Sequence, residues 1–331
     1  MDSSLVVASA GRTPAARGDT PQRPVAPPPA QRAPGARVEV LLSTYNGEKY
    51  LPELLQSLLD QSHRSIHLRV RDDGSTDGTL DILNEYVRGH PASLHTDVHL
   101  GVPASFFRLL HDADPEADFY GFCDQDDVWL PHKVEAAVDV LQRGDPSVPA
   151  LYCSALMPVD FQLRPLPNPW APPLALGFRN ALVENRASGC TAMFNRAARD
   201  LLTRCTPRAA QMHDHWVYLV VSAFGTVHYD PRPSMLYRQH ESNRVGIPNG
   251  WRSKLRSPRR RGGSPMYSQA EEFRAVYGDA LEPAFRAVLD RFLATRRGMA
   301  RRVGYALRPE TYRQTIADDL AHRVLIGLGL F

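Results

Sequence analysis

The sequence predicts an α/β protein with a mostly parallel central sheet, and three observations support this fold class. Short apolar runs typical of buried strands alternate with stretches whose apolar residues recur at helical spacing. Polar turns follow the apolar runs, which places ligand-binding side chains at the carboxyl ends of neighbouring strands. Apolar residues make up 43% of the 331 residues, enough for the core of one large domain or two ordinary ones.

The first part of the ordered chain is expected to form a β-α-β-α unit. The expected elements are a strand over 38–42, a helix over 48–61, a strand over 66–71 and a helix over 79–88. Polar turns at 43–47 and 72–75 follow the two strands. Alternation of this kind implies parallel strands joined by helical crossovers, so both turns lie at one edge of the sheet.

The next elements continue the pattern less regularly. They are a helix over 104–111, a strand over 119–123, a helix over 131–142 and a helix over 214–223. Residues 161–173 are rich in proline and are expected to form a surface loop. Residues 252–265 resemble a linker in composition, and 269–326 are expected to be helical.

Composition and charge divide the chain into three regions. They are a disordered leader over 1–36 with seven prolines, an α/β domain over 37–250, and a basic, mainly helical extension over 251–331. The net charge of +3 is the sum of +3 over 1–37, −8 over 38–250 and +8 over 251–331. An acidic body without a recognised reader motif argues against nucleic-acid binding.

Several classes of protein are excluded by what the sequence lacks. No apolar run approaches 18 residues, so no transmembrane helix is expected, and residues 5–10 are too short for a secretory signal. Four widely spaced cysteines without a CxxC pair indicate free thiols in a reducing cytoplasm. No GxGxxG follows the first strand and no P-loop is present, which disfavours dinucleotide and P-loop sites.

Three carboxylates crowd the end of the strand over 119–123. Asp124, Asp126 and Asp127 repel one another unless a cation joins them, and Mg²⁺ or Mn²⁺ suits such hard oxygen ligands. An alternative is an N-cap cluster for the helix after Pro131. Three residues separate the carboxylates from that helix, which favours the metal.

Six segments, in this order and at this spacing, resemble those of family 2 glycosyltransferases. They are LSTYNG at 42–47, DDGSTD at 72–77, DQDDVW at 124–129, SGCTAMFN at 188–195, HDHW at 213–216 and YRQH at 237–240. The last three are more similar to the rhamnosyltransferase-like branch. The resemblance covers roughly 38–246 and implies a GT-A fold, a nucleotide-sugar donor, a divalent metal and inversion at the anomeric carbon.

The resemblance gives the donor-side residues their expected roles. Thr44 and Tyr45 would lie against the nucleobase, with the Tyr45 ring as a stacking surface. Asp73 would accept a hydrogen bond from a pyrimidine N–H. A half-buried core aromatic at Tyr45 and an Asx turn at Asp73 are the alternatives.

The same resemblance assigns a metal site. Asp124 would hold the ribose or a metal-bound water, Asp126 would ligate the metal directly, and Asp127 is the less certain third member. His240 would complete the metal site, with a surface histidine in a loop as the alternative.

Asp214 is the expected general base. Inversion needs a carboxylate that takes the acceptor hydroxyl proton, and HDHW matches the family position, although His215 stands where the family often has an aromatic residue. The alternative is an N-cap role for Asp214. Trp216 is assigned to the acceptor site or to the core, and Arg238 to a phosphate or to the surface. Residues 189–191 are expected on a strand beside the sugar.

The basic extension carries an amphipathic pattern. Phe285, Leu289, Phe292 and Leu293 give one helix an apolar side between arginines. Peripheral membrane contact through 251–331 is the expected role. The alternative is that this apolar side packs on the rest of the protein.

Together these observations predict an inverting, metal-dependent glycosyltransferase. It would move a sugar such as L-rhamnose from a dTDP- or UDP-sugar to a cell-surface glycan or lipid-linked acceptor. We expect it in the cytoplasm, peripheral to the inner face of the plasma membrane. The alternatives are a non-catalytic nucleotide-sugar-binding protein and a sugar-nucleotide pyrophosphorylase, which would need a Gly-rich, Arg- and Lys-containing segment after the first strand.

Overall fold

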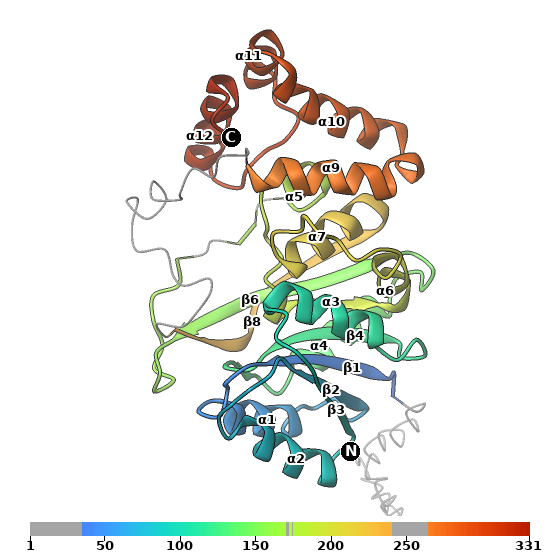
Figure 1. Ribbon diagram of the computed structural model, residues 1–331, viewed down its shortest axis with the longest axis vertical. Helices are drawn as coiled ribbons and strands as arrows, with labels where there is room; N and C mark the ends of the chain where they lie inside the picture. The colour runs from blue at the N-terminus through green and yellow to red at the C-terminus, as the bar shows by residue number, and fades with distance from the viewer. Residues whose placement is uncertain (1–34, 170–171, 174, 240–263) are drawn as a thin grey trace, which may run out of the picture. The chain divides into compact units, whose positions relative to one another are not determined.

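The computed structural model describes residues 35–169, 172–173, 175–239 and 264–331, and Gly35–Phe331 form one compact unit. An eight-stranded sheet runs through the described part in the order β3-β2-β1-β4-β7-β6-β8-β5 (Figure 1). The strands are β1 Val38–Thr44, β2 Ile66–Asp72, β3 Ala92–Thr96, β4 Phe119–Asp124, β5 Val128–Trp129, β6 Ala150–Val159, β7 Met193–Asn195 and β8 Thr226–Arg238.

The first half of the sheet is parallel and brings three predicted turns together. β1 lies between β2 and β4, and β3 extends the sheet beyond β2. Thr44 is paired with Asp72 of β2, and Ser43 is paired with Asp124 of β4. The carboxyl ends of β2, β1 and β4 are therefore immediate neighbours, as the sequence predicts.

The second half of the sheet is mixed. β7 runs antiparallel to both β4 and β6, β6 pairs in parallel with β8, and β5 pairs antiparallel with β8. The whole sheet has seven strand pairings among the described residues, and four of them are parallel. The parallel alternation seen in the sequence thus holds for β1 to β4 and gives way to a curled mixed sheet beyond them.

Helices cover both faces of the sheet. They are α1 Leu51–Leu59, α2 Thr79–Gly89, α3 Val102–Asp112, α4 Lys133–Leu141, α5 Phe178–Ala181, α6 Arg196–Leu202, α7 His213–Phe224, α9 Pro265–Tyr277, α10 Pro283–Ala294, α11 Met299–Leu307 and α12 Ile316–Leu328. Alternate residues of β1 enter opposite cores, Leu41 on one face and Val40 and Leu42 on the other. α1, α2 and α4 pack on the Val40 side, and α3, α6 and α7 pack on the Leu41 side.

The C-terminal helices extend the core on the Leu41 side (Figure 1). Phe273 of α9 contacts Trp216 of α7 with ring centroids 6.2 Å apart, and Phe285 of α10 lies 4.9 Å from Phe178. Leu289 and Phe292 are fully buried. The apolar side of α10 therefore packs inside the protein, and its expected position on a membrane is wrong for this helix.

Ion pairs offset part of the positive charge of the C-terminal helices. Arg274 pairs with Asp290, Arg291 with Glu310, and Arg296 with Glu271. None of the described helices is long and apolar enough to cross a membrane.

Candidate active site at the carboxyl edge of the sheet

Hydrogen bonds join the three predicted polar turns into one surface. The Gln125 side chain accepts from the Tyr45 N–H at 2.8 Å and donates to the Tyr45 carbonyl at 3.0 Å. The Thr76 N–H donates to Asn46 Oδ1 at 2.8 Å, and the Asn46 N–H donates to Ser75 Oγ at 2.9 Å. The loops after β1, β2 and β4 thereby hold one another in place, and Gln125 was not singled out from the sequence.

Asp72 organises the turn after β2. Its Oδ1 accepts the N–H groups of Gly74 and Ser75, and its Oδ2 accepts the hydroxyls of Thr44 and Ser75. Thr44 is buried, and its hydroxyl lies 2.9 Å from Asp72. These contacts make Asp72 the residue that closes the turn after β2, and they fix Thr44 at the end of β1.

The Asp73 carboxylate has more hydrogen-bond partners than the sequence indicates. Its carboxylate accepts the Arg71 guanidinium and the N–H groups of Leu100 and Gly101, each N–H at 2.7 Å, and His99 Nδ1 lies 3.0 Å from Oδ2. Burial acts to raise the pKa of Asp73, but these amides and Arg71 lower it below its ordinary value. About four lone-pair positions exist on a carboxylate. A base N–H would have to replace one of these partners.

Tyr45 presents an open aromatic face beside Asp73. Its side chain is 45% exposed, and its ring centroid lies 4.4 Å from that of His99, with the planes at 49°. His99 is itself half-exposed. Tyr45 is therefore available as a stacking surface, and the core-aromatic alternative does not apply. Sequence reasoning missed His99, because it follows the unpredicted strand β3.

The acidic cluster after β4 has the composition of a cation site. Ligand atoms of Asp124, Asp127 and Cys190 lie within 4.8 Å of one another. Asp127 is buried, and its Oδ2 has no hydrogen-bond partner among the described residues. Such an orphaned carboxylate oxygen is costly unless a cation neutralises it. The two carboxylates fit Mg²⁺ or Mn²⁺ better than the Cys190 thiol does, because these ions prefer oxygen ligands.

The pKa values of the cluster reflect burial and mutual repulsion. Burial, followed by the charges of Asp126 and Asp214, raises the pKa of Asp124 to about 7. Burial and the charges of Asp126 and Asp124 raise the pKa of Asp127 well above its ordinary value. The charges of Asp126 and of Asp214, which comes from a distant segment, therefore act on the cluster of Asp124 and Asp127.

The structure redistributes the predicted metal ligands. Asp127, the less certain member from sequence, contributes a ligand atom to the cluster, whereas Asp126 acts on it through its charge. Direct ligation by Asp126 stays a prediction. His240, the other predicted ligand, lies outside the described residues.

Arg238 has a different role from either one expected. Its side chain is buried, and it donates to the backbone carbonyls of Asp126 at 3.0 Å and Phe161 at 2.9 Å and pairs with Glu53. The backbone N–H of Arg238 donates to Asp127 Oδ1 at 3.3 Å. Arg238 therefore positions the acidic loop, the expectation of a plain surface residue is wrong, and contact with a phosphate stays a prediction.

Lys133 places a buried positive charge under the acidic loop. Its Nζ donates to the Cys190 carbonyl at 2.8 Å and lies 4.5 Å from the Trp129 ring centroid. Burial lowers the pKa of Lys133 to about 8, against the opposing charges of groups that include Asp127. Sequence reasoning missed this residue, because a lysine in the first turn of an amphipathic helix usually faces solvent.

Asp214 lies in the first turn of α7 and faces this cluster. Its Oδ2 accepts the Gly189 N–H at 2.9 Å, and its Oδ1 accepts the His215 N–H at 2.7 Å. The N-cap of α7 is Met212, so the alternative of Asp214 as the N-cap is wrong. Burial raises the pKa of Asp214 from its ordinary value, although these N–H groups act in the opposite direction.

The two neighbouring histidines are neutral supports. Burial lowers the pKa of His213 to about 3 and that of His215 to about 4. The His213 ring stacks on Phe106 at 4.0 Å, and His215 Nε2 lies 2.7 Å from the Ala181 carbonyl. They anchor the start of α7 and thereby fix Asp214.

Two further expectations are corrected by the packing. Residues Gly189–Thr191 form a 3₁₀ turn ahead of β7 and no strand. A Cβ at Gly189 would lie 2.7 Å from His213 Nε2, so the packing of this turn on α7 leaves no room for a side chain at position 189. Trp216 is fully buried against α9 and belongs to the core, which excludes the acceptor-site role.

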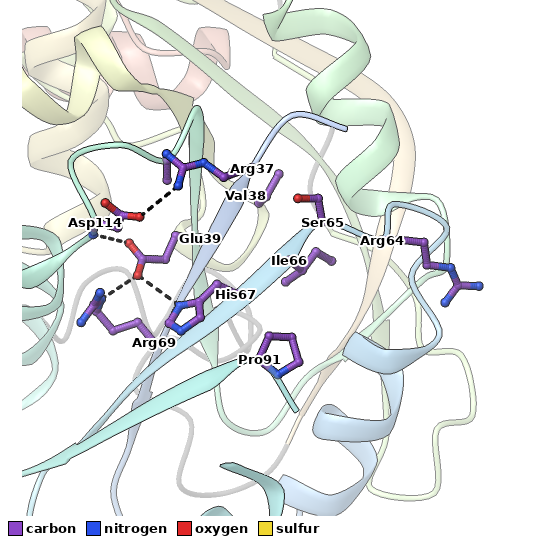
Figure 2. A pocket seen from close by; sticks show the side chains of 11 residues that line it. Arg37, Val38, Glu39, Arg64, Ser65, Ile66, His67, Arg69, Pro91 and Asp114 are labelled. Atoms are coloured by element: carbon purple, nitrogen blue, oxygen red, sulfur yellow. Dashed lines mark hydrogen bonds and ion pairs between the residues drawn. The ribbon is translucent and has the colours of Figure 1, made fainter. Parts of the chain in front are cut away.

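A cavity of about 490 Å³ lies at the opposite, amino-terminal edge of the sheet (Figure 2). Its buried carboxylate, Glu39, accepts from Arg69 Nε at 2.7 Å and from the Asp114 N–H at 2.6 Å, and His67 Nδ1 lies 3.3 Å away. The central carboxylate of this cavity is thus satisfied by its neighbours. Asp127 Oδ2, by contrast, lies at the carboxyl edge and has no partner in the described part of the chain.

Comparison with solved structures identifies the fold. The structure superposes on S. aureus TarS 1-349 in complex with UDP-GlcNAc with a TM-score of 0.54 at 18% identity, over 88% of this chain and 81% of that one. A mixed sheet of this order, with polar loops and carboxylates at its carboxyl edge, is the GT-A architecture. The protein therefore has the GT-A fold.

Comparison of sequences identifies the family. Residues 39–202 match the family model described as Glycosyl transferase family 2. The dTDP-rhamnosyl transferase RfbG of Shigella flexneri is 28% identical over 227 residues, 65% of this chain and 77% of RfbG. The putative teichuronic acid biosynthesis glycosyltransferase TuaG of Bacillus subtilis (strain 168) is 28% identical over 56% of this chain and 73% of TuaG. The chain belongs to the family 2 glycosyltransferases, which sets aside the pyrophosphorylase and the non-catalytic alternatives.

Proposed function

We propose that this glycosyltransferase inverts the anomeric carbon with Asp214 as the general base and with Mg²⁺ or Mn²⁺ at the acidic cluster. The observation that carries the proposal is that Asp124 and Asp127 lie in one cluster and that the charge of Asp214, from a distant segment, acts on Asp124. Asp124 and Asp127 would hold the ion, with Asp126 and His240 as further candidate ligands. When bound, the ion neutralises charge on the leaving diphosphate.

Asp214 suits the role of base by both position and protonation. Its two oxygens are oriented by the Gly189 and His215 N–H groups, and the Asn185 side chain also hydrogen-bonds Asp214, so an acceptor hydroxyl would take the place of one of these partners. In the reaction the hydroxyl proton passes to Asp214, the freed oxygen bonds to the anomeric carbon, and the bond from that carbon to the phosphate oxygen breaks. A pKa raised by burial brings the base closer to the operating pH.

The donor is proposed to be a pyrimidine nucleotide sugar that stacks on Tyr45. The base would enter beside the open Tyr45 ring, and its N–H would take the place on Asp73 Oδ2 that His99 now fills. Thr44 shapes the floor of this site. RfbG is described as a dTDP-rhamnosyl transferase and TarS was solved with UDP and with UDP-GlcNAc, which supports dTDP or UDP as the carrier and rhamnose as one sugar to test.

The acceptor is proposed to be a hydroxyl of a cell-surface glycan or of its lipid-linked precursor. The descriptions of RfbG and TuaG, a rhamnosyl transferase and a teichuronic acid enzyme, support this class. We propose that transfer occurs on the cytoplasmic side of the membrane, where nucleotide sugars are made.

The base assignment is tested with Asp214→Asn. Asn keeps an oxygen for the Gly189 N–H and loses the ability to take a proton, so transfer should fall at least about a thousandfold with the donor still bound. Sugar transfer is measured together with donor-induced thermal stabilisation in Mn²⁺. Asp139→Asn, on the exposed side of α4, is the matched control. Transfer by Asp214→Asn at the wild-type rate would exclude Asp214 as the base.

A further inference from the structure

The outer sides of α11 and α12 carry apolar side chains that nothing in the described part of the chain covers. The exposed residues are Met299, Val303 and Leu307 of α11 and Ile316, Leu320, Val324, Leu325 and Leu328 of α12. Their exposed fractions run from 39% at Leu325 to 81% at Ile316. We refer to these eight residues as the α11–α12 surface. An apolar group of this size on one pair of helices marks an interaction site.

The exposed residues form helical stripes. Apart from Leu325, which follows Val324, the members of each helix recur every fourth residue, which places them one turn apart on one side. The inner sides are occupied separately, by buried Tyr305 on α11 and by buried His322 and Ile326 on α12. Each helix therefore has two apolar sides, one in the core and one facing outward, whereas an ordinary surface helix has a polar outer side.

Arginines accompany this surface. Residues 295–331 contain seven arginines and three acidic residues. Arg297 and Arg308 flank the α11 stripe in the sequence, whereas Arg301 lies on the other side of α11; all three are exposed, and none has a carboxylate partner among the described residues. Two of the acidic residues are already paired, Glu310 with Arg291 and Asp319 with Arg323. The surface thus offers apolar side chains together with uncompensated positive charge.

We propose that the α11–α12 surface binds the face of an anionic lipid bilayer. The leucines, isoleucine and valines would enter the boundary between headgroups and acyl chains, Arg297 and Arg308 would contact the lipid phosphates, and Arg301 would add positive charge near the bilayer without lying on the apolar side. Arginine suits this position, because its stem can lie on apolar surface while the guanidinium stays among the headgroups. The stripes lie on two short helices, so the contact is interfacial and does not span the bilayer.

Charge favours a lipid surface over a second copy of the chain. Two α11–α12 surfaces in contact would bring unpaired arginines together, and the paired Glu310 and Asp319 offer little to offset them. An anionic bilayer supplies both the apolar phase and the missing negative charge. The proposal differs from the sequence expectation in the helices used, since the apolar side of α10 is buried in the core. It also stands apart from the donor, metal and base proposed above.

Vesicle flotation of the full-length protein tests this inference without donor or acceptor. Wild-type protein should float with phosphatidylcholine–phosphatidylglycerol vesicles, float poorly with phosphatidylcholine alone, and detach as salt rises. Arg297→Glu, Arg301→Glu and Arg308→Glu combined should weaken binding by about tenfold or more, at near-unchanged melting temperature. Leu307→Gln, Leu320→Gln and Leu328→Gln combined should weaken it comparably and reduce the share that survives high salt.

Matched controls separate this surface from other basic segments. Val276→Gln changes an exposed apolar residue on α9, and Arg143→Glu reverses an exposed charge at the end of α4. Both should bind vesicles as the wild type does. Equal flotation of the two triple variants and the wild type would overturn the proposal. Sedimentation that shows a dimer dissociated by the leucine variant, with no vesicle binding by the wild type, would also overturn it and assign the surface to a second copy.

Discussion

At the scale of single residues, the sequence identifies the chemical groups of the site more reliably than their state. Asp124 and Asp214 were predicted and are brought into one site, although 90 positions separate them. The roles of Asp127, Lys133 and Arg238 were not predicted, because they depend on burial. A sequence does not show which of three neighbouring carboxylates is desolvated, or that a lysine and an arginine are turned inward beneath them. Such facts follow from packing by distant elements.

The raised pKa of Asp124 predicts that the ion-free protein loses stability as pH rises through about 7. The folded state holds this proton more tightly than the unfolded chain, so the stabilisation is complete below the unfolded pKa and is lost as pH rises through the folded pKa. The lowered pKa values of His213 and His215 have the opposite effect, because they make the folded protein more stable as pH rises. This effect is confined mainly to pH values below about 6.5. Melting temperature with EDTA should therefore fall from about pH 6.5 to about pH 8.

Mn²⁺ should reverse this loss, because metal binding requires the deprotonated carboxylates. The stabilisation by Mn²⁺ should be larger at about pH 8 than at about pH 6. Asp124→Asn should flatten the fall in melting temperature with EDTA and abolish the stabilisation by Mn²⁺. If Mn²⁺ raised the melting temperature of the wild type equally at both pH values, the result would contradict the proposed metal site.

Arg238 gives a second prediction at this scale. Arg238→Gln removes the guanidinium that holds the Asp126 carbonyl, Phe161 and Glu53, so the acidic loop should loosen. We expect a lower Mn²⁺ affinity by about tenfold and a destabilisation of about 2–4 kcal/mol. Calorimetry of Mn²⁺ binding and thermal unfolding measure the two effects. Arg232→Gln, an exposed arginine paired with Asp230 on the same strand, is the control. Unchanged Mn²⁺ affinity in Arg238→Gln would show that the loop keeps its shape without this contact.

At the scale of elements, the sequence predicts the parallel half of the sheet and misses the long strands of the other half. β1, β2, β4 and the helices between them carry clear periodicity and turn signals. β8 contains Pro231 and Pro233, and proline within a run argues against a strand. In the structure these prolines fall where the pairing of β6 with β8 shifts register, after Ser154. A bulge of this kind accommodates residues that cannot donate to the ladder, and only the neighbouring strand reveals it.

The turn ahead of β7 provides a prediction at the scale of elements. In Gly189→Ala the new Cβ would lie 2.7 Å from His213 Nε2 and 3.2 Å from Asp214 Cβ, so the start of α7 must shift. Catalysis depends on placing the base accurately, and we expect kcat to fall by about a hundredfold with donor affinity little changed. Steady-state kinetics measure this.

Gly89→Ala is the matched control for the turn, because a Cβ there meets nothing within 4 Å at the end of α2. It should leave kcat unchanged and alter stability slightly. If Gly189→Ala showed the kcat of the wild type, the close packing of this turn on α7 would not position the base.

At the scale of the whole molecule, the sequence suggests an acidic catalytic body with a separate basic extension, and the structure joins them through one core. Buried residues of α9 and α10 belong to the same cluster as Trp216 of α7 and Leu41 of β1. Their identity as core residues could not be read from the sequence, because an amphipathic helix has the same pattern whether it packs on a protein or on a lipid surface. Burial distinguishes α10, which faces the core, from α11 and α12, which keep apolar stripes outside.

A shared core predicts that the C-terminal helices and the catalytic site unfold together. Phe292 is fully buried and lies 4.8 Å from the Tyr267 ring, so Phe292→Ala should cost about 3–5 kcal/mol. Because α9 covers Trp216, and Trp216 shares α7 with Asp214, this loss should lower the melting temperature of the entire unit in one transition. Calorimetry checks this, with loss of transferase activity followed over the same temperatures. Val276→Ala, partly exposed on α9, should shift the transition slightly. Two separate transitions, with activity lost only in the unshifted one, would mean that the helices form an independent domain and that deleting them is a fair test of vesicle binding.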